Sequence, residues 1–299
     1  MWRKQCMTIL EKMSRDLGLS EKYILSKINR SYIFYSKHFT YNKRGKKREV
    51  YEPSAELKLF QTWVNKNILV HYPVSIYATA YEDETSIRKN AYRHKDSSYI
   101  LHTDIRHFFE SITFKQVSEI FRNDYSEEDI QTILKIVMLN GKVPTGSITA
   151  PRIANRVMYD FDEELVDELS KIQKVIYTRY ADDIVISSEE YIREEILQKI
   201  VELLKKYGFE CNKDKTYYAN KRCRRNITGV VLDNNHDSIS IGWRRYKDLK
   251  LKIYKYLKYG DGNKESIRGE LAFLKGINGN KYLAIKNHYK DMDLNGDIF

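Results

Sequence analysis

The stretch YTRYADDIVISS, residues 177–188, places two adjacent carboxylates, Asp182 and Asp183, between two β-prone runs. The aromatic and β-branched residues on both sides predict a short hairpin with the carboxylates at its tip. A structural two-residue hairpin turn is usually Asn-Gly or Asp-Gly, because the turn needs positive φ angles. An Asp-Asp pair alone also occurs in ordinary turns, so the pair needs support from elsewhere in the chain.

A third aspartate supports a functional site. Asp104 lies at the end of the β-prone part of SSYILHTDIRHFFESI, residues 97–112, which predicts a strand, a turn and a helix. If this strand is next to the hairpin, the three carboxylates meet. Magnesium binds carboxylate oxygens together with substrate phosphates, and two ions about 4 Å apart can serve phosphoryl transfer. We therefore predict a site for two Mg²⁺ ions.

The composition fits a soluble protein that binds a polyanion. The chain has 299 residues and 52 Lys and Arg against 41 Asp and Glu, a net charge of +11. Such an excess can be a solvated surface, but it also attracts nucleic-acid phosphates. Some of the 24 Tyr and 11 Phe could stack on unpaired bases. The cysteine spacing predicts neither disulfides nor a zinc site, and no apolar stretch approaches 18 residues, so we expect a cytoplasmic protein without a membrane span.

Apolar spacing and turn residues predict the following order of elements. The predicted helices cover residues 19–30, 54–69, 115–140, 149–170 and 189–207, with a basic helical tail from residue 242. The predicted strands form a basic hairpin around NKRGK in 31–53, a strand in 97–104, two strands around Ala181–Asp182, and one near 226–232. The middle of the chain therefore suits an antiparallel sheet with helices on one face.

YADD with its flanking strands resembles the catalytic motif of reverse transcriptases. Residues 46–64 are similar to the fingers region of the bacterial enzymes, and HTDIRHFFESI to the motif with the first metal-binding aspartate. VPTGSITAPRIAN, residues 143–155, resembles the Pro-Gln-Gly stretch, and residues 208–216 resemble the segment after the helix that follows the hairpin. NAYRH, residues 90–94, fits the N-A-x-x-H motif of retron reverse transcriptases, and NITG, residues 226–229, is close to their V-T-G triplet.

The resemblance implies an α+β right-hand polymerase with fingers, a ferredoxin-like palm and a small helical thumb. We expect N-terminal helices and fingers in residues 1–95, the palm with part of the fingers in 96–232, and the thumb in 233–299. It also implies an RNA-directed DNA polymerase whose template and primer are one structured non-coding RNA. The enzyme would join dNTPs to a 2′-OH of that RNA, giving a short single-stranded DNA (msDNA), in many cases for anti-phage defence with an effector protein.

The resemblance also assigns roles near the carboxylates. Asp104 and Asp182 would bind metal, with Asp183 as a partial ligand, and the carbonyl of Ile105 could also coordinate. Phe109, five residues after Asp104, matches the aromatic gate against a ribose 2′-OH. The alternative for Phe109 is a core position.

Further residues are expected to contact the nucleotide. Arg48 and Lys47 would bind the triphosphate, unless the basic hairpin is solvated or touches RNA backbone. Gly146 would let the backbone approach the template or the incoming base, although Thr145 stands where the family usually has Gln. Lys215 is a candidate general acid for the pyrophosphate leaving group, or an exposed lysine near phosphate.

A last group is expected to bind RNA. Asn90 and His94 share a helical face and could recognise the cognate RNA, although His94 could instead be a cap or a structural hydrogen-bond partner. Thr228 and Gly229 could act near the primer. The cations of the tail should follow phosphate backbone, unless that helix is simply solvated. They are Arg244, Arg245, Lys247, Lys250 and Lys252.

Three alternatives remain at this point. The chain could belong to another reverse transcriptase class, such as the group II intron, diversity-generating or abortive-infection enzymes. It could be a non-catalytic RNA-binding protein with a polymerase fold, although the intact carboxylates argue against this. A viral-type RNA-dependent RNA polymerase fits less well, because Phe109 predicts the use of deoxynucleotides.

Overall fold

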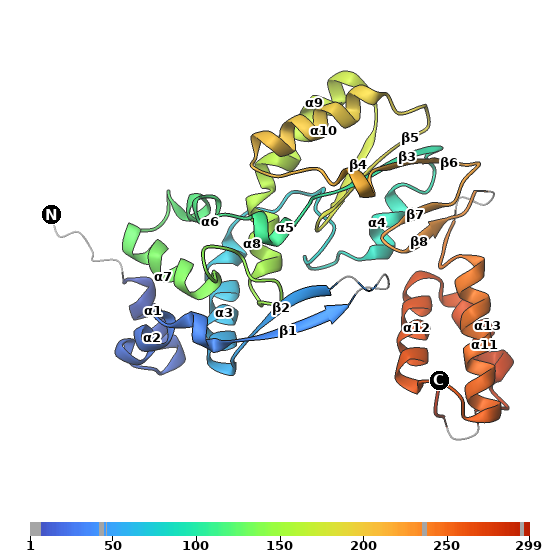
Figure 1. The fold of residues 1–299 in the computed structure, drawn as a ribbon, viewed down its shortest axis with the longest axis horizontal. Helices are drawn as coiled ribbons and strands as arrows, with labels where there is room; N and C mark the ends of the chain where they lie inside the picture. Colours follow the sequence, from blue (N-terminus) through green and yellow to red (C-terminus); the bar gives the residue numbers. More distant parts are fainter. Residues whose placement is uncertain (1–6, 42–44, 46, 235–237, 294–295) are drawn as a thin grey trace.

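The computed structural model describes residues 7–41, 45, 47–234, 238–293 and 296–299. Its centre is a four-stranded antiparallel sheet in the order β4-β5-β3-β6 (Figure 1). The strands are β3 (Tyr99–Asp104), β4 (Ile176–Tyr180), β5 (Asp183–Ser188) and β6 (Tyr217–Asn220). Helices separate β3 from β4 and β5 from β6, which gives the strand order of a ferredoxin-like fold. The predicted antiparallel sheet is therefore confirmed.

Both faces of the two inner strands, β3 and β5, are buried, because their side chains alternate between two hydrophobic cores. Ile184 and Ile186 pack in one core with α9 (Tyr159–Ile172) and α10 (Glu194–Lys206). Ile100 and Val185 point the other way and belong to a second core, which includes α4 (Ile87–Arg93). Helices on only one face were expected, and the structure differs because α4 covers the opposite face.

The N-terminal part builds the lobe at the left of Figure 1. Its elements are α1 (Ile9–Leu17), α2 (Glu21–Ile28), β1 (Tyr35–Tyr41), β2 (Lys47–Pro53) and α3 (Ala55–Asn67). β1 and β2 pair as the predicted hairpin. Its tip lies mostly outside the described residues. Ser20 and Ser54 cap α2 and α3 by accepting hydrogen bonds from the backbone, as their sequence predicts.

Two predicted helices are each divided in the structure. The helix expected over 115–140 is α6 (Phe114–Phe121) and α7 (Glu127–Val137), because Ser126 accepts a hydrogen bond from Asp129 N and starts a new helix. The helix expected over 149–170 is α8 (Ala150–Val157) and α9, separated at Met158. α10 starts at Glu194, five residues after the predicted start. A short helix, α5 (Phe108–Ser111), follows β3.

The single strand predicted near 226–232 is a hairpin. β7 (Arg225–Ile227) pairs with β8 (Val230–Leu232), and the turn residues Thr228 and Gly229 have φ angles of 47° and 86°. Positive φ at both central residues is the geometry that joins two strands tightly. β9 (Ile239–Ser240) completes a three-stranded sheet, and the domain boundary expected at 232/233 falls inside it.

The predicted basic helical tail is a lobe of three helices, seen at the lower right of Figure 1. They are α11 (Trp243–Tyr259), α12 (Lys264–Ile277) and α13 (Gly279–Tyr289). Their apolar faces share the second core with β7–β9. Within the described residues, none of the helices combines the length and the apolar character needed to cross a lipid bilayer.

Candidate active site

Three carboxylates meet at one end of the central sheet. Asp104 ends β3 and Asp183 begins β5, and the two residues are direct partners in the antiparallel register. One oxygen atom from each of Asp104, Asp182 and Asp183 lies within 4.8 Å of the others. The strands are therefore neighbours, as the predicted site requires.

The turn that carries Asp182 is held in a strained conformation. Tyr180 pairs with Asp183, so the hairpin loop is only Ala181 and Asp182. Ala181 has φ of +57°, which costs a residue other than glycine about 1–2 kcal/mol. Two hydrogen bonds fix the turn, one from Arg179 NH1 to the Ala181 carbonyl (3.1 Å) and one from Ile105 N to the Asp182 carbonyl (2.9 Å). The surrounding structure thus replaces the usual glycine.

Arg179 reaches this turn from a buried ion pair. Its guanidinium binds both oxygens of Asp162 on α9, at 2.8 and 2.6 Å, and both side chains are fully buried. Tyr177 donates a further hydrogen bond to Asp162 at 2.6 Å. Burial acts to lower the pKa of Arg179, but Asp162 more than offsets this, so the pKa is raised and the guanidinium stays charged. Sequence reasoning missed this pair, whose only signal was an arginine inside a β-prone run.

Asp104 is the most enclosed of the three carboxylates, with 2% of its surface exposed. Lys215 Nζ lies 2.5 Å from its Oδ2, and Asn212 Nδ2 donates to its Oδ1 at 2.9 Å. The backbone N–H of Asn212 also donates to the Asp104 carbonyl. Lys215 is therefore at the site, as predicted, with its ammonium beside a carboxylate. Asn212 is a residue that sequence reasoning missed.

The chemistry of the donor set fits magnesium. Burial and the charges of Asp104 and Asp183 raise the pKa of Asp182 to about 7, because a third negative charge is disfavoured there. Divalent cations relieve that repulsion, and carboxylate oxygens are the ligands that Mg²⁺ prefers. Asp104, Asp182 and Asp183 are therefore able to hold such ions.

His102 is a further residue that sequence reasoning missed. Its Nε2 lies 3.5 Å from Asp183 Oδ1, and its ring stacks on Tyr217 with the centroids 4.9 Å apart. Burial acts to lower the pKa of His102, but the hydrogen bond and charge of Asp183 raise it overall. The signal was available, because residues 102 and 104 of a strand face the same side.

Phe109 lies on α5, which begins after His107, a residue with φ of 49°. Phe108 is the ring that fills the core, with 3% of its surface exposed and its centroid 5.8 Å from that of Phe209. Phe109 is only half-buried. Its role as a gate, and the role of the Ile105 carbonyl as a metal ligand, stay predictions.

Gly146 is needed for packing of the N-terminal hairpin. Its φ is +105°, and a Cβ atom there would lie 2.7 Å from Val50 Cγ1 and 3.0 Å from the Tyr51 carbonyl oxygen. Next to it, Tyr51 N donates to the Thr145 carbonyl at 2.8 Å. The close approach that this glycine permits is therefore to β2, and an approach to template or base is not required to explain it.

Asn90 and His94 are buried, with 0% of their surface exposed. His94 Nδ1 and Nε2 each lie 2.7 Å from a hydroxyl, those of Ser187 and Thr178, and burial lowers its pKa to about 3. Asn90 Nδ2 donates to Thr228 Oγ1 at 3.0 Å. The prediction that these two side chains contact RNA directly is therefore corrected, because neither side chain has any exposed surface. The alternative, a structural hydrogen-bond partner, describes His94.

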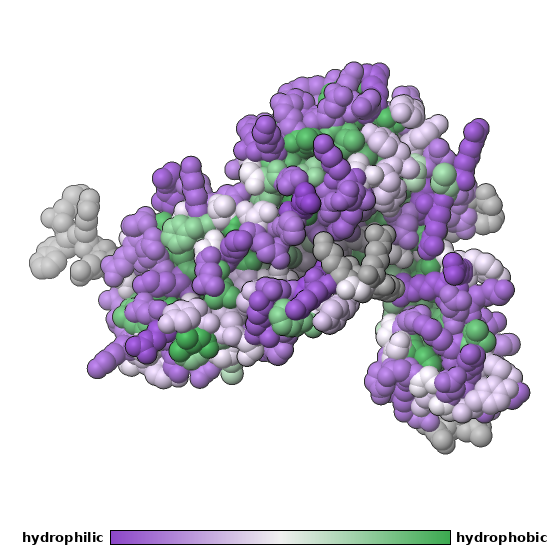
Figure 2. All heavy atoms as spheres, in the orientation of Figure 1, coloured by the Kyte–Doolittle hydropathy of each residue, from purple (hydrophilic) through white to green (hydrophobic). Residues whose placement is uncertain are grey.

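The remaining predicted contacts lie at or near the surface. Gly229 is exposed in the β7–β8 turn, with the half-buried Thr228 before it. Lys47, Arg48 and Arg244 are exposed. Arg245 and Lys250 on α11 are half-buried, and the guanidinium carbon of Arg245 lies 4.2 Å from the centre of a phenylalanine ring. Hydrophilic residues cover much of the lobe that contains α11 in the view of Figure 2.

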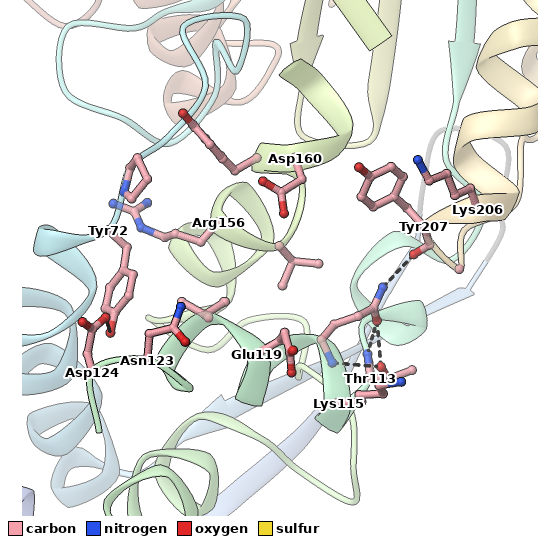
Figure 3. A pocket seen from close by; sticks show the side chains of 16 residues that line it. Tyr72, Thr113, Lys115, Glu119, Asn123, Asp124, Arg156, Asp160, Lys206 and Tyr207 are labelled. Atoms are coloured by element: carbon pink, nitrogen blue, oxygen red, sulfur yellow. Dashed lines mark hydrogen bonds between the residues drawn. The ribbon is translucent and has the colours of Figure 1, made fainter. Parts of the chain in front are cut away.

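A cavity of about 850 Å³ lies between α6, α8 and the end of α10 (Figure 3). Several of its polar groups bond to one another, as in the hydrogen bonds from Tyr72 to Asp124 (2.9 Å) and from Gln116 to the Tyr207 carbonyl (2.9 Å). None of the predicted site residues lines it. The carboxylates are therefore the candidate active site.

Comparison with known proteins shows the family to which this chain belongs. The family described as reverse transcriptase (RNA-dependent DNA polymerase) matches residues 39–255, a range that includes all three carboxylates. The chain is 31% identical to the retron Ec73 reverse transcriptase of Escherichia coli over 272 residues, 83% of this chain and 84% of that protein. It is 28% identical to the retron Ec86 reverse transcriptase of Escherichia coli over 266 residues, 85% of this chain and 80% of that protein.

Among solved structures, a telomerase from Candida albicans in complex with a fragment of telomeric RNA has a TM-score of 0.48 and 12% identity, over 85% of this chain and 56% of that one. The family match covers more than half of the chain, and the Ec73 relative is matched over most of its length. This chain is an RNA-directed DNA polymerase with the right-hand fold, and it belongs to the retron reverse transcriptases.

Proposed function

We propose that this enzyme copies one structured non-coding RNA into a short single-stranded DNA, the msDNA, and that the same RNA supplies the primer. The first nucleotide would be joined to a 2′-OH of that RNA. The meeting of Asp104, Asp182 and Asp183 beside Lys215 carries the proposal, because nucleotidyl transfer needs concentrated negative ligands next to a cation. The similarity to retron reverse transcriptases supports the choice of RNA and product.

Asp104, Asp182 and Asp183 would hold two Mg²⁺ ions. Bound ions would lower the pKa of the attacking hydroxyl and neutralise the triphosphate. The chain itself would supply the geometry. Arg179 and Ile105 hold the turn of Asp182 by hydrogen bonds, so that its carboxylate stays beside the other two.

The neighbouring side chains would bind the dNTP. Lys47 and Arg48 are exposed on β2 and would contact its phosphates. Phe109 would exclude a ribose 2′-OH by its size, because its half-buried ring packs against the core and leaves part of its surface accessible. Lys215 would donate a proton to the leaving pyrophosphate, or would neutralise it.

We assign residues 1–95 to the N-terminal helices and fingers, residues 96–240 to the palm with part of the fingers, and the rest, which contains α11–α13, to the thumb. The palm–thumb boundary of the sequence prediction therefore moves past the β7–β9 sheet. Arg244, Arg245 and Lys250 of α11 would contact RNA phosphates. A partner effector protein and a role in anti-phage defence complete the proposal and follow from the family alone. The cytoplasmic location that we propose follows from the cysteine spacing and the apolar content of the sequence.

The test is to purify the protein from cells that carry its native locus and to sequence the nucleic acid that stays bound. Half of the sample is treated with RNase, and half with a nuclease that hydrolyses 2′–5′ phosphodiester bonds. We expect a discrete short DNA linked to RNA, released by the second nuclease. A DNA joined through an ordinary 3′ linkage would favour another reverse transcriptase class.

Two variants accompany this test. The double variant Asp182→Ala/Asp183→Ala should bind the RNA and contain no DNA. The control Glu163→Ala/Asp167→Ala removes two exposed carboxylates four residues apart on α9 and should contain the DNA in full. RNA without DNA in the unmodified protein and in both variants would contradict the proposed product.

A further inference from the structure

Tyr81 has an unfavourable backbone conformation and an exposed ring. Its φ is +68°, and 43% of its surface is exposed. A bulky residue rarely adopts positive φ, and such strain tends to occur at functional sites. Tyr81 belongs to neither hydrophobic core, so core packing does not offset the cost here. The strained conformation of Tyr81 therefore has no explanation in folding and suggests a functional role.

Neighbouring side chains hold the backbone on both sides of Tyr81. Asn155 Nδ2 on α8 donates to the Ala80 carbonyl at 2.8 Å and to Glu82 Oε1 at 2.9 Å. Arg156 NH1 also binds Glu82 Oε1 at 2.9 Å. Asn155 is buried and the Arg156 side chain is only 5% exposed. These bonds fix where Tyr81 points.

The same segment extends along the free edge of β4. Thr79 N donates to the Arg179 carbonyl, and Arg179 N donates to the Tyr77 carbonyl, both at 2.8 Å. This pairing carries Tyr81 to the end of β4, where its ring lies beside that of Tyr180, with the centroids 6.5 Å apart. Burial and the charge of Asp182 raise the pKa of Tyr81 to about 12, in agreement with a phenol close to the carboxylates.

Tyr81 and Phe109 belong to segments on opposite sides of strand β5, which begins at Asp183. Tyr81 belongs to the β4 edge, and Phe109 follows β3, with β5 between them. Nucleotidyl transfer brings two reactants to the carboxylates. One is the incoming nucleotide, and the other is the end of the duplex that is being extended. If Phe109 faces the incoming nucleotide, as proposed above, the rings at the β4 edge face the duplex end.

We propose that Tyr81, together with Tyr180, is a binding surface for the terminal base pair of the template–primer duplex. An aromatic face stacks on bases and sugars of any sequence, which a polymerase requires. Holding that base pair fixes the attacking hydroxyl, and small displacements at this point are costly for the rate. The strain at residue 81 is then the cost of placing a ring there. The inference rests on the proposed nucleotidyl-transfer site but not on priming from a 2′-OH.

The experiment uses the full chain with an RNA template annealed to a DNA primer that has a free 3′-OH. We measure the Kd of this duplex by fluorescence anisotropy without dNTP, the KM for duplex and for dNTP, and the thermal midpoint. Tyr81→Gly should weaken duplex binding about tenfold or more, as for loss of one stacked base, with the dNTP KM unchanged. Its thermal midpoint should not fall, because glycine adopts positive φ freely.

Two further variants separate the ring from the backbone. Tyr81→Phe keeps the ring and should retain most of the affinity. Glu84→Gly relieves the same kind of strain in the same segment, at φ of +63°, and should bind the duplex as the unmodified protein does. Tyr81→Gly with normal duplex binding, or with a loss of affinity that accompanies a lower thermal midpoint, would overturn the inference.

A 2-aminopurine base at the duplex end gives a readout that a structural role would not change. Stacking on Tyr81 quenches its fluorescence, and Tyr81→Gly should remove that quenching. Placing the probe first in the template and then in the primer identifies the strand that the ring contacts, and quenching that is unchanged in both would count against the inference. Because the duplex is supplied, failure to find msDNA in cells leaves this result unaffected.

Discussion

The end of the central sheet and the thumb contain ion pairs of the same length in different surroundings. Arg179 and Asp162 lie 2.6 Å apart with both side chains fully buried. Lys252 on α11 and Glu270 on α12 are also 2.6 Å apart, but their side chains are 50% and 20% exposed. In the palm a change to one partner leaves a buried charge, whereas in the thumb water replaces the partner.

The comparison teaches where this enzyme tolerates change. The palm buries charged groups such as Arg179 and Asp162 and holds them by several hydrogen bonds. Substitution of one of these residues should therefore cause a large loss of stability or activity. The thumb buries apolar residues and exposes its cations, so its changes should be small and should depend on salt.

The largest effect is expected for Asp182→Asn. Loss of one of three clustered carboxylates should reduce DNA synthesis by at least about 1,000-fold, roughly 4 kcal/mol of barrier, with RNA binding retained. Primer extension measures DNA synthesis, and filter binding measures RNA binding. The exposed Asp167→Asn is the control, and retained synthesis in Asp182→Asn would refute the assignment.

The variant Asp182→Asn should lose activity but gain stability when no metal is bound. The pKa of Asp182 is raised to about 7, so the ionised carboxylate destabilises the metal-free fold. The destabilisation is complete above pH 7 and disappears as the pH falls towards 4. Asp182→Asn should therefore raise the thermal midpoint at pH 8 in EDTA, and the difference should vanish at pH 4. Added Mg²⁺ should stabilise the unmodified protein more than the variant.

The second prediction concerns Arg179→Met. It leaves Asp162 buried without its partner and removes the hydrogen bond to the Ala181 carbonyl, so the free energy of unfolding should fall by about 3–5 kcal/mol. Lys252→Met, its counterpart in the thumb, should cost less than about 1 kcal/mol. Urea unfolding measures the free energy of unfolding of both variants. Equal losses in the two variants would remove the contrast between the palm and the thumb.

The third prediction is a loss of sugar selectivity in Phe109→Ala. Excluding a single hydroxyl is worth about 1–3 kcal/mol, so incorporation of ribonucleotides relative to deoxynucleotides should rise about 10- to 100-fold. Competitive incorporation assays measure the ratio. Phe114→Ala, which removes an exposed ring on α6, is the control. An unchanged ratio would make Phe109 a packing residue.

The sequence predicted the parts of this site in which residue type and strand position coincide. Asp104 ends one β-prone run and Asp183 begins another, so placing the strands side by side was enough to bring the carboxylates together. The order of strands and helices likewise predicted an antiparallel sheet, and the resemblance to reverse transcriptases implied its ferredoxin-like form. Chemistry and local pattern agree at these positions, which is why they could be recognised.

Other parts depend on contacts between distant residues. The spacing of Asn90 and His94 placed them on one helical face but did not indicate that this face packs against β4 and β5. The partner of Arg179 is 17 residues away, on α9. The break between α6 and α7 lies at polar residues that a helix also tolerates. Only the packed fold reveals which side chains are buried.

The smallest effect is expected in the thumb, for Arg244→Ala. Arg244 is exposed on α11, so its loss should weaken RNA binding only about two- to fivefold at low salt. If the guanidinium contacts one phosphate, the slope of log K against log[salt] should become less steep by about one. Titrations at several salt concentrations measure this slope, with Arg122→Ala, at the exposed residue that follows α6, as the control. A slope that does not differ from that of the control would mean that α11 is a solvated helix, and the functional contrast between palm and thumb would then rest on the palm alone.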